Sequence, residues 1–185
     1  MDKIVFQLSA DNANEIYTFA KHYIDSKEPH EALQYCLCNL TKDSVKVSFC
    51  DGHKLAEITL PIWTEQEVEA TFLIAPPNRK FKYKTEPVVS IEKDEKQTSY
   101  VTATGTTCIP CEQIPYPFTD RIWTSPDKYT FKIAFKPSVL VPALQAFEAD
   151  ESVRMDFVNE VSGVTLTQAN KRALVLPVKI VGDKN

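Results

Sequence analysis

Apolar and polar residues alternate at the start of the chain and then switch to a helical spacing. Ile4, Phe6 and Leu8 share one face of residues 3–8, which predicts a half-buried strand. Ser9 and Asp11 follow as candidate helix N-caps. The next apolar residues recur every three or four positions: Ala13, Ile16, Tyr17, Ala20, Tyr23 and Ile24. They predict an amphipathic helix of about three turns that ends before Pro29.

Three short β-type segments come next, separated by polar turns: residues 32–40, 45–50 and 55–62. The turn after the second segment contains Asp51-Gly52, a strong signal for a tight turn. The first part of the chain, residues 3–62, therefore predicts a β-α-β-β-β unit.

The last sixty residues repeat this order. The alternating pattern of residues 129–135 predicts a strand, and a helix follows. Pro142 is tolerated only in a first helical turn, so this helix must begin near Pro137 or Ser138. Its inward face is apolar: Leu140, Ala143, Leu144 and Phe147. Three strands are predicted after it: 153–159, 164–168 and 173–181. Such a unit cannot bury its own face, so we expect the copies to pack side by side.

The middle of the chain has no helical periodicity. It contains strand candidates at 70–75, 88–93 and 99–107, with a polar hairpin tip at 94–97. Residues 110–126 are rich in proline and predict an extended connector. We therefore expect three segments: a first unit at 1–62, a β-rich middle with its connector at 63–125, and a second unit at 126–185.

Composition and charge narrow the class of protein. The chain has 185 residues, a formal net charge of −4 and only four glycines. An acidic chain is not a wholly basic nucleic-acid binder, and few glycines argue against a phosphate-cradling loop. The chain contains no apolar run of 18 residues, and it begins without a signal-peptide pattern. We expect a cytoplasmic protein without a membrane span.

The cysteines and histidines predict neither a metal nor a cofactor. Five cysteines, an odd number, favour free thiols in the cytosol. Cys108 and Cys111 form one C-x-x-C, but no second such pair and no histidine pair at helical spacing accompanies them. Asp51 and His53 are neighbours in a tight turn and point apart, so they do not predict an acid–base pair. Since nucleotide-binding and metalloprotease motifs are also missing, we expect a protein that is not an enzyme.

Several motifs resemble the bacterial DNA polymerase III beta subunit, the DNA sliding clamp. Residues 49–56, F-C-D-G-H-K-L-A, resemble the T-D-G-H-R-L-A signature of that family. Residues 115–122 resemble the connector between two domains of that family. Residues 152–155 resemble the strand after its last helix, and residues 174–180 resemble its terminal strand. The chain is identified as a shortened or divergent member, because a clamp subunit has three domains of two units each. It is either a reduced clamp or one clamp domain with a β insertion between its halves.

The resemblance implies an α+β fold of repeated β-α-β-β-β units, with antiparallel sheets and the helices on one face. It also implies a non-catalytic homo-oligomer that encircles double-stranded DNA without sequence preference. Such a protein tethers DNA polymerase or repair proteins through short linear peptides. The matching positions for the peptide pocket are Gly52, His53, Lys54, Leu55, Val161, Leu174, Leu176, Pro177 and Val178. The alternative for the aliphatic residues is that they are simply sheet core.

The residues for DNA contact match less well. The candidates are Lys21 and His22 in the first helix, Lys136 before the second, and Arg79, Lys80, Lys82 and Lys84 in the middle. Phe81 and Tyr83 alternate with these cations, so the stretch could grip phosphates and stack on bases. A strand with outward lysines that protect a sheet edge is the alternative. Acidic residues such as Glu15 and Asp25 weaken the case for the first helix.

Two other functions remain open at this point. The chain could be a protein-interaction module with the clamp fold that does not encircle DNA. It could also be an unrelated small α+β ligand-binding protein or enzyme, which a formed pocket with perturbed titratable groups would favour.

Overall fold

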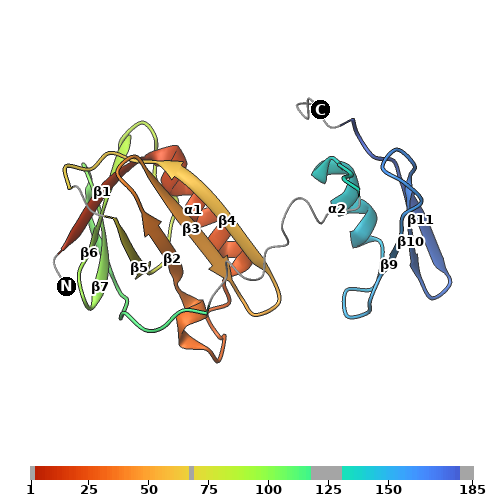
Figure 1. Ribbon diagram of the computed structural model, residues 1–185, viewed down its shortest axis with the longest axis horizontal. Coiled ribbons are helices and arrows are strands. Elements are labelled where there is room, and N and C mark those ends of the chain that lie inside the picture. Colours follow the sequence, from red (N-terminus) through yellow and green to blue (C-terminus); the bar gives the residue numbers. More distant parts are fainter. Residues whose placement is uncertain (1–2, 67–68, 118–130, 180–185) are drawn as a thin grey trace. The chain divides into compact units, whose positions relative to one another are not determined.

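The chain forms two compact units, Met1–Ile122 (unit 1) and Trp123–Asn185 (unit 2) (Figure 1). The computed structural model describes residues 3–66, 69–117 and 131–179. The predicted strand at 129–135 and connector at 110–126 each lie partly outside these described residues.

Unit 1 begins with the predicted β-α-β-β-β order. Its elements are β1 (Ile4–Ser9), α1 (Ala10–Tyr23), β2 (Cys36–Leu40), β3 (Ser44–Cys50) and β4 (Leu55–Pro61). Ser9 is the N-cap of α1, as predicted, and its hydroxyl accepts a hydrogen bond from the Asn12 amide at 3.2 Å. The predicted strand at 32–40 is shorter than expected, because a 3-10 turn, Glu31–Gln34, precedes β2.

The middle of the chain repeats the same order without the helix. It contains β5 (Ala70–Ile74), β6 (Val88–Lys93), β7 (Gln97–Thr102) and β8 (Gly105–Pro110), and no helix lies between β5 and β6. The predicted hairpin tip is confirmed, since the Asp94 carboxylate accepts hydrogen bonds from the Lys96 and Gln97 amides. The prediction of one strand at 99–107 is wrong. The chain reverses at 103–104, and β7 pairs with β8.

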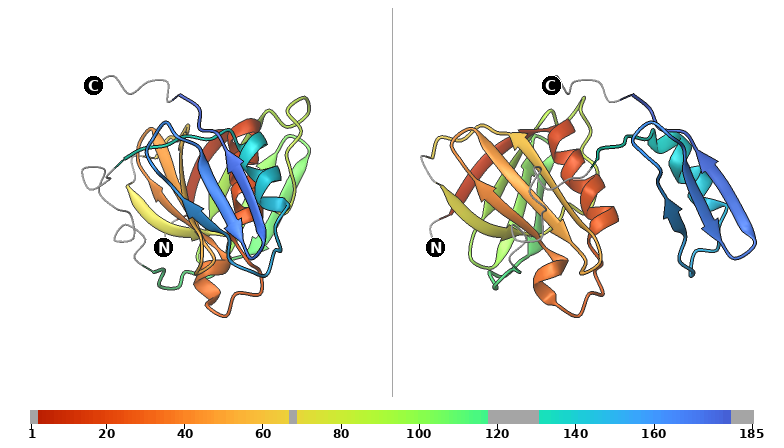
Figure 2. Two further views of the ribbon diagram at one scale, coloured as in Figure 1. Left: turned by 90° about the vertical axis from the view of Figure 1, so that its right-hand side faces the viewer. Right: turned by 45° about the vertical axis from the view of Figure 1, so that its right-hand side comes forward.

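The two repeats of unit 1 exchange their first strands. β1 pairs antiparallel with β6, and β5 pairs antiparallel with β2. The resulting sheets have the strand orders β1-β6-β7-β8 and β4-β3-β2-β5 (Figure 2). The predicted first unit and middle segment therefore form one compact unit. Within that unit the middle is a second repeat, which shares both sheets with the first.

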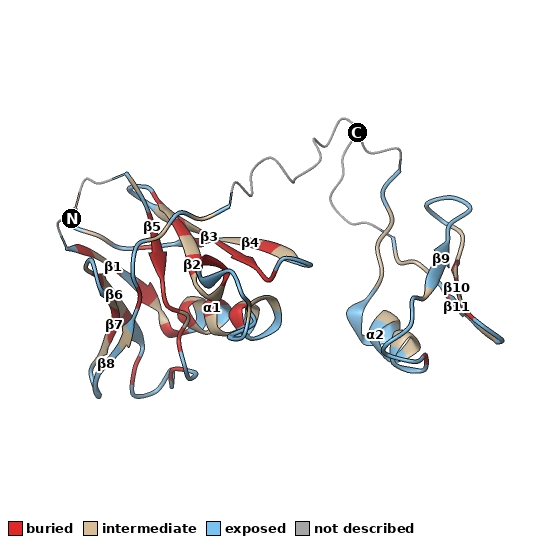
Figure 3. Ribbon diagram, turned by 90° about the horizontal axis from the view of Figure 1, so that it is seen from below, coloured by how far each residue is buried: buried red, intermediate tan, exposed pale blue. Residues whose placement is uncertain are grey.

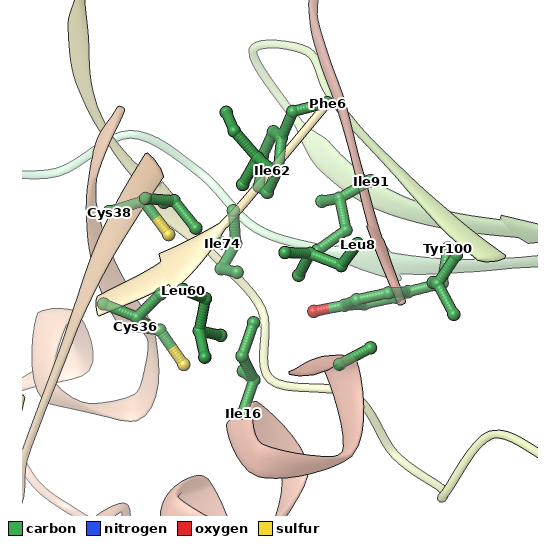
Figure 4. Close-up of a cluster of buried hydrophobic side chains, with 14 of the residues drawn as sticks. Phe6, Leu8, Ile16, Cys36, Cys38, Leu60, Ile62, Ile74, Ile91 and Tyr100 are labelled. Atoms are coloured by element: carbon green, nitrogen blue, oxygen red, sulfur yellow. The ribbon is translucent and has the colours of Figure 1, made fainter. Parts of the chain in front are cut away.

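One core holds the two sheets and α1 together. α1 contacts β1 and β6 of one sheet and β3 and β4 of the other. Its Ile16 side chain meets Leu8 of β1 and Leu60 of β4 within a cluster of fully buried apolar residues (Figure 4). At roughly 25 cal/mol per Å² of apolar surface, such burial is the main stabilisation of unit 1.

Unit 2 is smaller and has less buried surface (Figure 3). It contains α2 (Pro137–Gln145), β9 (Arg154–Asp156), β10 (Val164–Gln168) and β11 (Lys171–Val175), with the sheet order β11-β10-β9. The predicted inner face of the second helix is confirmed, because Leu140, Ala143 and Leu144 pack against the buried core of the sheet. β9 and β11 are shorter than the predicted strands, and only an isolated bridge at Ala134 represents the described part of 129–135.

Pro142 departs from the expectation for the second helix. α2 begins at Pro137, as predicted, but Pro142 is its sixth residue and so lies beyond the first turn. There it removes a backbone donor that would pair with the carbonyl of Ser138. Pro142 is exposed, and no residue of α2 is fully buried, so the proline ring does not disturb a packed core.

None of the described helices is both long and apolar enough to cross a membrane. All five cysteines are free, and four of them are buried. The C-x-x-C pair is split by the fold, because Cys108 is exposed on β8 whereas Cys111 is buried.

Candidate functional site: an exposed apolar patch and scattered cations

The β3–β4 turn carries four of the predicted pocket residues. Gly52 adopts φ +79°, a conformation that L side chains rarely adopt, so the turn requires glycine. The Asp51 carboxylate accepts hydrogen bonds from the backbone amides of His53 (3.0 Å) and Lys54 (2.7 Å). Burial raises the pKa of Asp51, but these bonds and the Lys54 ammonium outweigh it, so the pKa lies below its ordinary value. The turn is thus rigid, with Gly52, His53 and Lys54 exposed and Leu55 half-buried.

Lys54 fastens this turn to the end of α1. Its ammonium lies 2.9 Å from the Asp51 carboxylate and donates to the His22 carbonyl at 2.7 Å. It also lies over the Tyr23 ring, 5.7 Å from the centroid. The last carbonyls of a helix have no partner within the helix, so a cation here stabilises α1. The His53 imidazole faces solvent and is the group of this turn that remains open to a ligand.

The other predicted pocket residues lie in unit 2, and three of them are exposed apolar side chains. Leu174 and Leu176 are 64% and 68% exposed, and Val161 is 79% exposed. We name these three residues, with Gly163, the leucine patch. A Cβ on Gly163 would lie 2.8 Å from Leu174 Cδ1 and 3.2 Å from Leu176 Cδ2. Both leucine side chains therefore lie against Gly163, and a larger residue at this position would displace them. The interpretation of these three side chains as sheet core is therefore wrong.

Hydrogen bonds to backbone groups hold the chain on either side of the leucine patch. The Asn159 carboxamide accepts hydrogen bonds from the amides of Val161 (3.0 Å) and Ser162 (2.7 Å). The Val178 amide donates to the Ala134 carbonyl at 2.8 Å. Pro177 and Val178 are half-buried, so they support the patch more than they form its surface.

The basic candidates on the helices are exposed and few. Lys21 and His22 lie in the last turn of α1, and Lys136 is the residue that precedes α2. Asp11 in the first turn of α1 and Glu15 in its second carry the opposite charge and are also exposed. The outer face of α1 is therefore mixed in charge.

The basic stretch of the middle segment, residues 79–84, is not the strand at a sheet edge that one alternative predicted. Its residues form turns between β5 and β6, not an edge strand. Arg79 makes two hydrogen bonds of 2.6 and 2.9 Å to the Glu86 carboxylate, which is almost fully buried. The Arg79 guanidinium is the main reason that the pKa of Glu86 lies well below its ordinary value, and Thr104 adds to the effect. Arg79 is thus paired with a buried carboxylate of the same unit.

Phe81 is part of the buried core. It is buried against Tyr100, with ring centroids 5.8 Å apart, and Arg79 covers its ring. The hypothesis that Phe81 stacks on bases is therefore wrong, because no base can reach the ring. Tyr83, at 65% exposed, faces solvent. Lys80, Lys82 and Lys84 are exposed and remain candidates for phosphate contact.

The described residues contain no group of three or more histidine, cysteine, aspartate or glutamate side chains placed to hold a metal ion. Burial raises the pKa of the Cys36, Cys38 and Cys111 thiols, which disfavours the reactive thiolate form. The buried Lys93 ammonium donates to the carbonyls of Asp94 and Cys111 and thereby ties the hairpin tip to the chain after β8. These groups are structural. Sequence patterns missed Lys93 and Glu86 because a single charged residue within a strand or turn does not show that it is buried.

Solved structures of bacterial clamps share this arrangement of strands. The DNA polymerase III beta chain of Streptococcus pneumoniae superposes with a TM-score of 0.74 over 99% of this chain and 51% of its own, at 13% identity. The fold is that of the bacterial DNA sliding clamps. The beta subunit of Thermotoga maritima (TM-score 0.53, 16% identity) covers 96% of this chain and 66% of its own. The Bacillus subtilis clamp (TM-score 0.51, 13% identity) covers 97% and 65%.

The similarity is one of fold. No protein-family profile and no curated protein sequence matches the chain. The chain spans between half and two thirds of the length of these clamp structures. The predicted α+β clamp-like fold, with antiparallel sheets, is thereby confirmed, and it is present at a sequence identity at which only scattered motifs are recognisable.

Proposed function

We propose that this chain is a non-catalytic, clamp-like protein that associates with double-stranded DNA and tethers a DNA polymerase or repair protein through a short linear peptide. The sliding-clamp fold supports the class of protein. The leucine patch supports the peptide contact, and the exposed lysines support a loose, sequence-independent contact with phosphates. The protein acts as a homo-oligomer in the cytoplasm and uses no cofactor.

The leucine patch is the single observation that carries this proposal. Leu174 and Leu176 place two large apolar side chains side by side in solvent, over a glycine that leaves room between them. A peptide with one or two large apolar anchors buries such side chains, and a fully buried leucine contributes about 2 kcal/mol relative to an exposed one. In unit 1, Gly52, His53, Lys54 and Leu55 are a further proposed contact for a peptide, with His53 as the polar group.

Fluorescence polarisation of labelled pentapeptides with leucine and phenylalanine anchors tests the peptide contact. We expect Leu176→Asp to weaken binding by about tenfold or more, because it places a charge in the apolar contact. Gly163→Ala should also weaken binding, since its methyl group displaces the Leu174 side chain. Val158→Asp is the matched control, because Val158 is an exposed valine of the same unit outside the patch. Equal binding by all four proteins would refute the proposed contact.

A salt series with a labelled 30-base-pair duplex tests the DNA contact. We expect weak binding that falls steeply with salt, and a smaller salt slope when Lys80, Lys82 and Lys84 are replaced by glutamine. Lys27→Gln, another exposed lysine of unit 1, is the control. Light scattering over a concentration series tests the oligomer, and a discrete multimer is the expected result.

The mixed charge of α1 favours a second candidate function, an interaction module that has the clamp fold but does not encircle DNA. Asp11 and Glu15 on the outer face offset Lys21 and His22, so this helix attracts phosphates weakly. A protein that stays monomeric and ignores the duplex, yet binds pentapeptides through the leucine patch, would establish this second function and refute the first.

A further inference from the structure

The second repeat of unit 1 lacks the helix that the first repeat has. In the exchanged arrangement, β5 corresponds to β1, and β6, β7 and β8 correspond to β2, β3 and β4. α1 packs on β1, β3, β4 and β6. The equivalent place for a helix of the second repeat is therefore bounded by β5, β7, β8 and β2, beside α1.

The chain between β5 and β6 fills only part of this place. Phe81 packs on Tyr100 of β7, and the Asn14 carboxamide binds both backbone groups of Phe81, at 2.7 Å to its amide and 3.0 Å to its carbonyl. These contacts lie at the N-terminal half of α1. Beside the C-terminal half of α1 and the residue after it, from Tyr17 to Ile24, the described residues of the β5–β6 segment leave a groove open.

A groove of about 500 Å³ lies along that uncovered half. Its walls come from α1, from the end of β5, from the end of β8 and from the residues before β2, which are the elements that would surround the missing helix. The apolar lining includes Tyr17, Ile24, Tyr35, Pro76, Pro77 and Ile109.

One charged side chain lines the groove. Lys21 is exposed at its wall, and among the described residues it has no ion pair. An apolar channel with one cation does not suit a nucleic-acid backbone, which requires several cations in succession. It suits a helix with an apolar face, which inserts anchors at positions i, i+3 and i+4 and brings a carboxylate to the cation.

We propose that this groove binds an amphipathic helix of a partner protein, with small or medium apolar side chains on the buried face and an acidic residue opposite Lys21. The partner helix takes the place of the helix that the second repeat lacks. The groove shares no residue with the leucine patch, so it adds a second docking site for proteins.

Selection from a displayed library of 16-residue helical peptides tests the proposal, with the full chain as target. Enriched peptides should share an apolar i, i+3, i+4, i+7 face and an acidic residue at one position. Lys21→Glu should weaken their binding by about tenfold, because it replaces an attraction by a repulsion. A second selection against the Lys21→Glu protein should yield lysine or arginine at that same position. Lys84→Glu is the matched control, since Lys84 does not line the groove.

Four results would overturn the proposal. They are the absence of helical binders tighter than about 100 µM, binders that Lys21→Glu leaves unchanged, enrichment of extended proline-rich peptides in place of helices, and a self-associated chain whose dimer interface blocks all binders. Leu176→Asp, which disables the leucine patch, should leave the selected helices bound. Failure of the pentapeptide assay and failure of this one are therefore distinguishable.

Discussion

The side-chain amide of Gln113 pairs with both backbone groups of Leu73. The Leu73 amide donates to Gln113 Oε1 at 2.8 Å, and Gln113 Nε2 donates to the Leu73 carbonyl at 3.0 Å. Leu73 lies on β5, the edge strand of its sheet, so the glutamine occupies the position of a neighbouring strand. Gln66 does the same on β1, where it binds the Val5 amide and the Lys3 carbonyl, both at 3.0 Å. Each exchanged strand thus has a covered edge, which limits unwanted pairing with other chains.

Loss of the Gln113 amide should destabilise unit 1. We expect Gln113→Leu to lower the free energy of unfolding by about 1–2 kcal/mol, because the Leu73 backbone groups lose their partners in a partly buried site. Urea denaturation measures the effect. Gln7→Leu is the matched control, since Gln7 is an exposed glutamine on β1. Equal stability of the two variants would show that water replaces the Gln113 contacts without cost.

The Arg79–Glu86 pair should make the stability of unit 1 dependent on pH. The pKa of Glu86 is lowered in the folded chain, so the carboxylate stabilises the fold above the pKa of an unfolded glutamate, about 4.3. That contribution is lost as the pH falls below this value. We expect Glu86→Gln to cost about 2 kcal/mol at pH 7, because Arg79 loses the charge of its buried partner, and to reduce the loss of stability between pH 5 and pH 3.

Urea titrations at several pH values, with Glu15→Gln as the control, test this expectation. Glu15 is an exposed glutamate on α1. A pH profile of Glu86→Gln that parallels the original chain would contradict the role of Glu86.

Phe81 and Tyr83 should differ sharply on truncation. Phe81→Ala empties a buried site against Tyr100 and should cost about 3–4 kcal/mol. Tyr83→Ala removes a side chain that faces solvent and should change stability by less than about 0.5 kcal/mol. Thermal unfolding of both variants measures the difference. A large loss for Tyr83→Ala would show that this ring has a structural contact.

Replacement of Pro142 should stabilise unit 2. Alanine restores the helical hydrogen bond to the Ser138 carbonyl and removes the clash of the proline ring, so we expect a gain of about 1–2 kcal/mol in local stability. Hydrogen exchange of the α2 amides measures it, since slower exchange reports a more stable helix. Ser138→Ala, which leaves the proline in place, is the control. Unchanged exchange in Pro142→Ala would mean that the helix has already adapted to the proline.

The sequence by itself determined the local structure. Alternation of apolar residues located β1, and short β-type segments located β6 and β10. Helical spacing located α1 and the inner face of α2, and Ser9 and Asp51-Gly52 marked a cap and a turn correctly. These features depend on residues a few positions apart. The periodicity of apolar residues and the residue types of turns and caps are therefore visible in a short stretch of sequence. The motif at 49–56 also pointed to the clamp fold, which the solved structures confirm.

The tertiary structure alone decided which segments belong together. The exchange of β1 and β5 pairs residues that are 30 or more positions apart in the sequence, and no local period records such a pairing. Burial of Phe81 and Glu86, exposure of Leu174 and the groove beside α1 likewise depend on neighbours that are distant in sequence. The sequence around a charged or aromatic residue looks the same whether its side chain is exposed to water or buried against another side chain. Its role is therefore decided by packing, which follows from the whole chain and not from a short window of it.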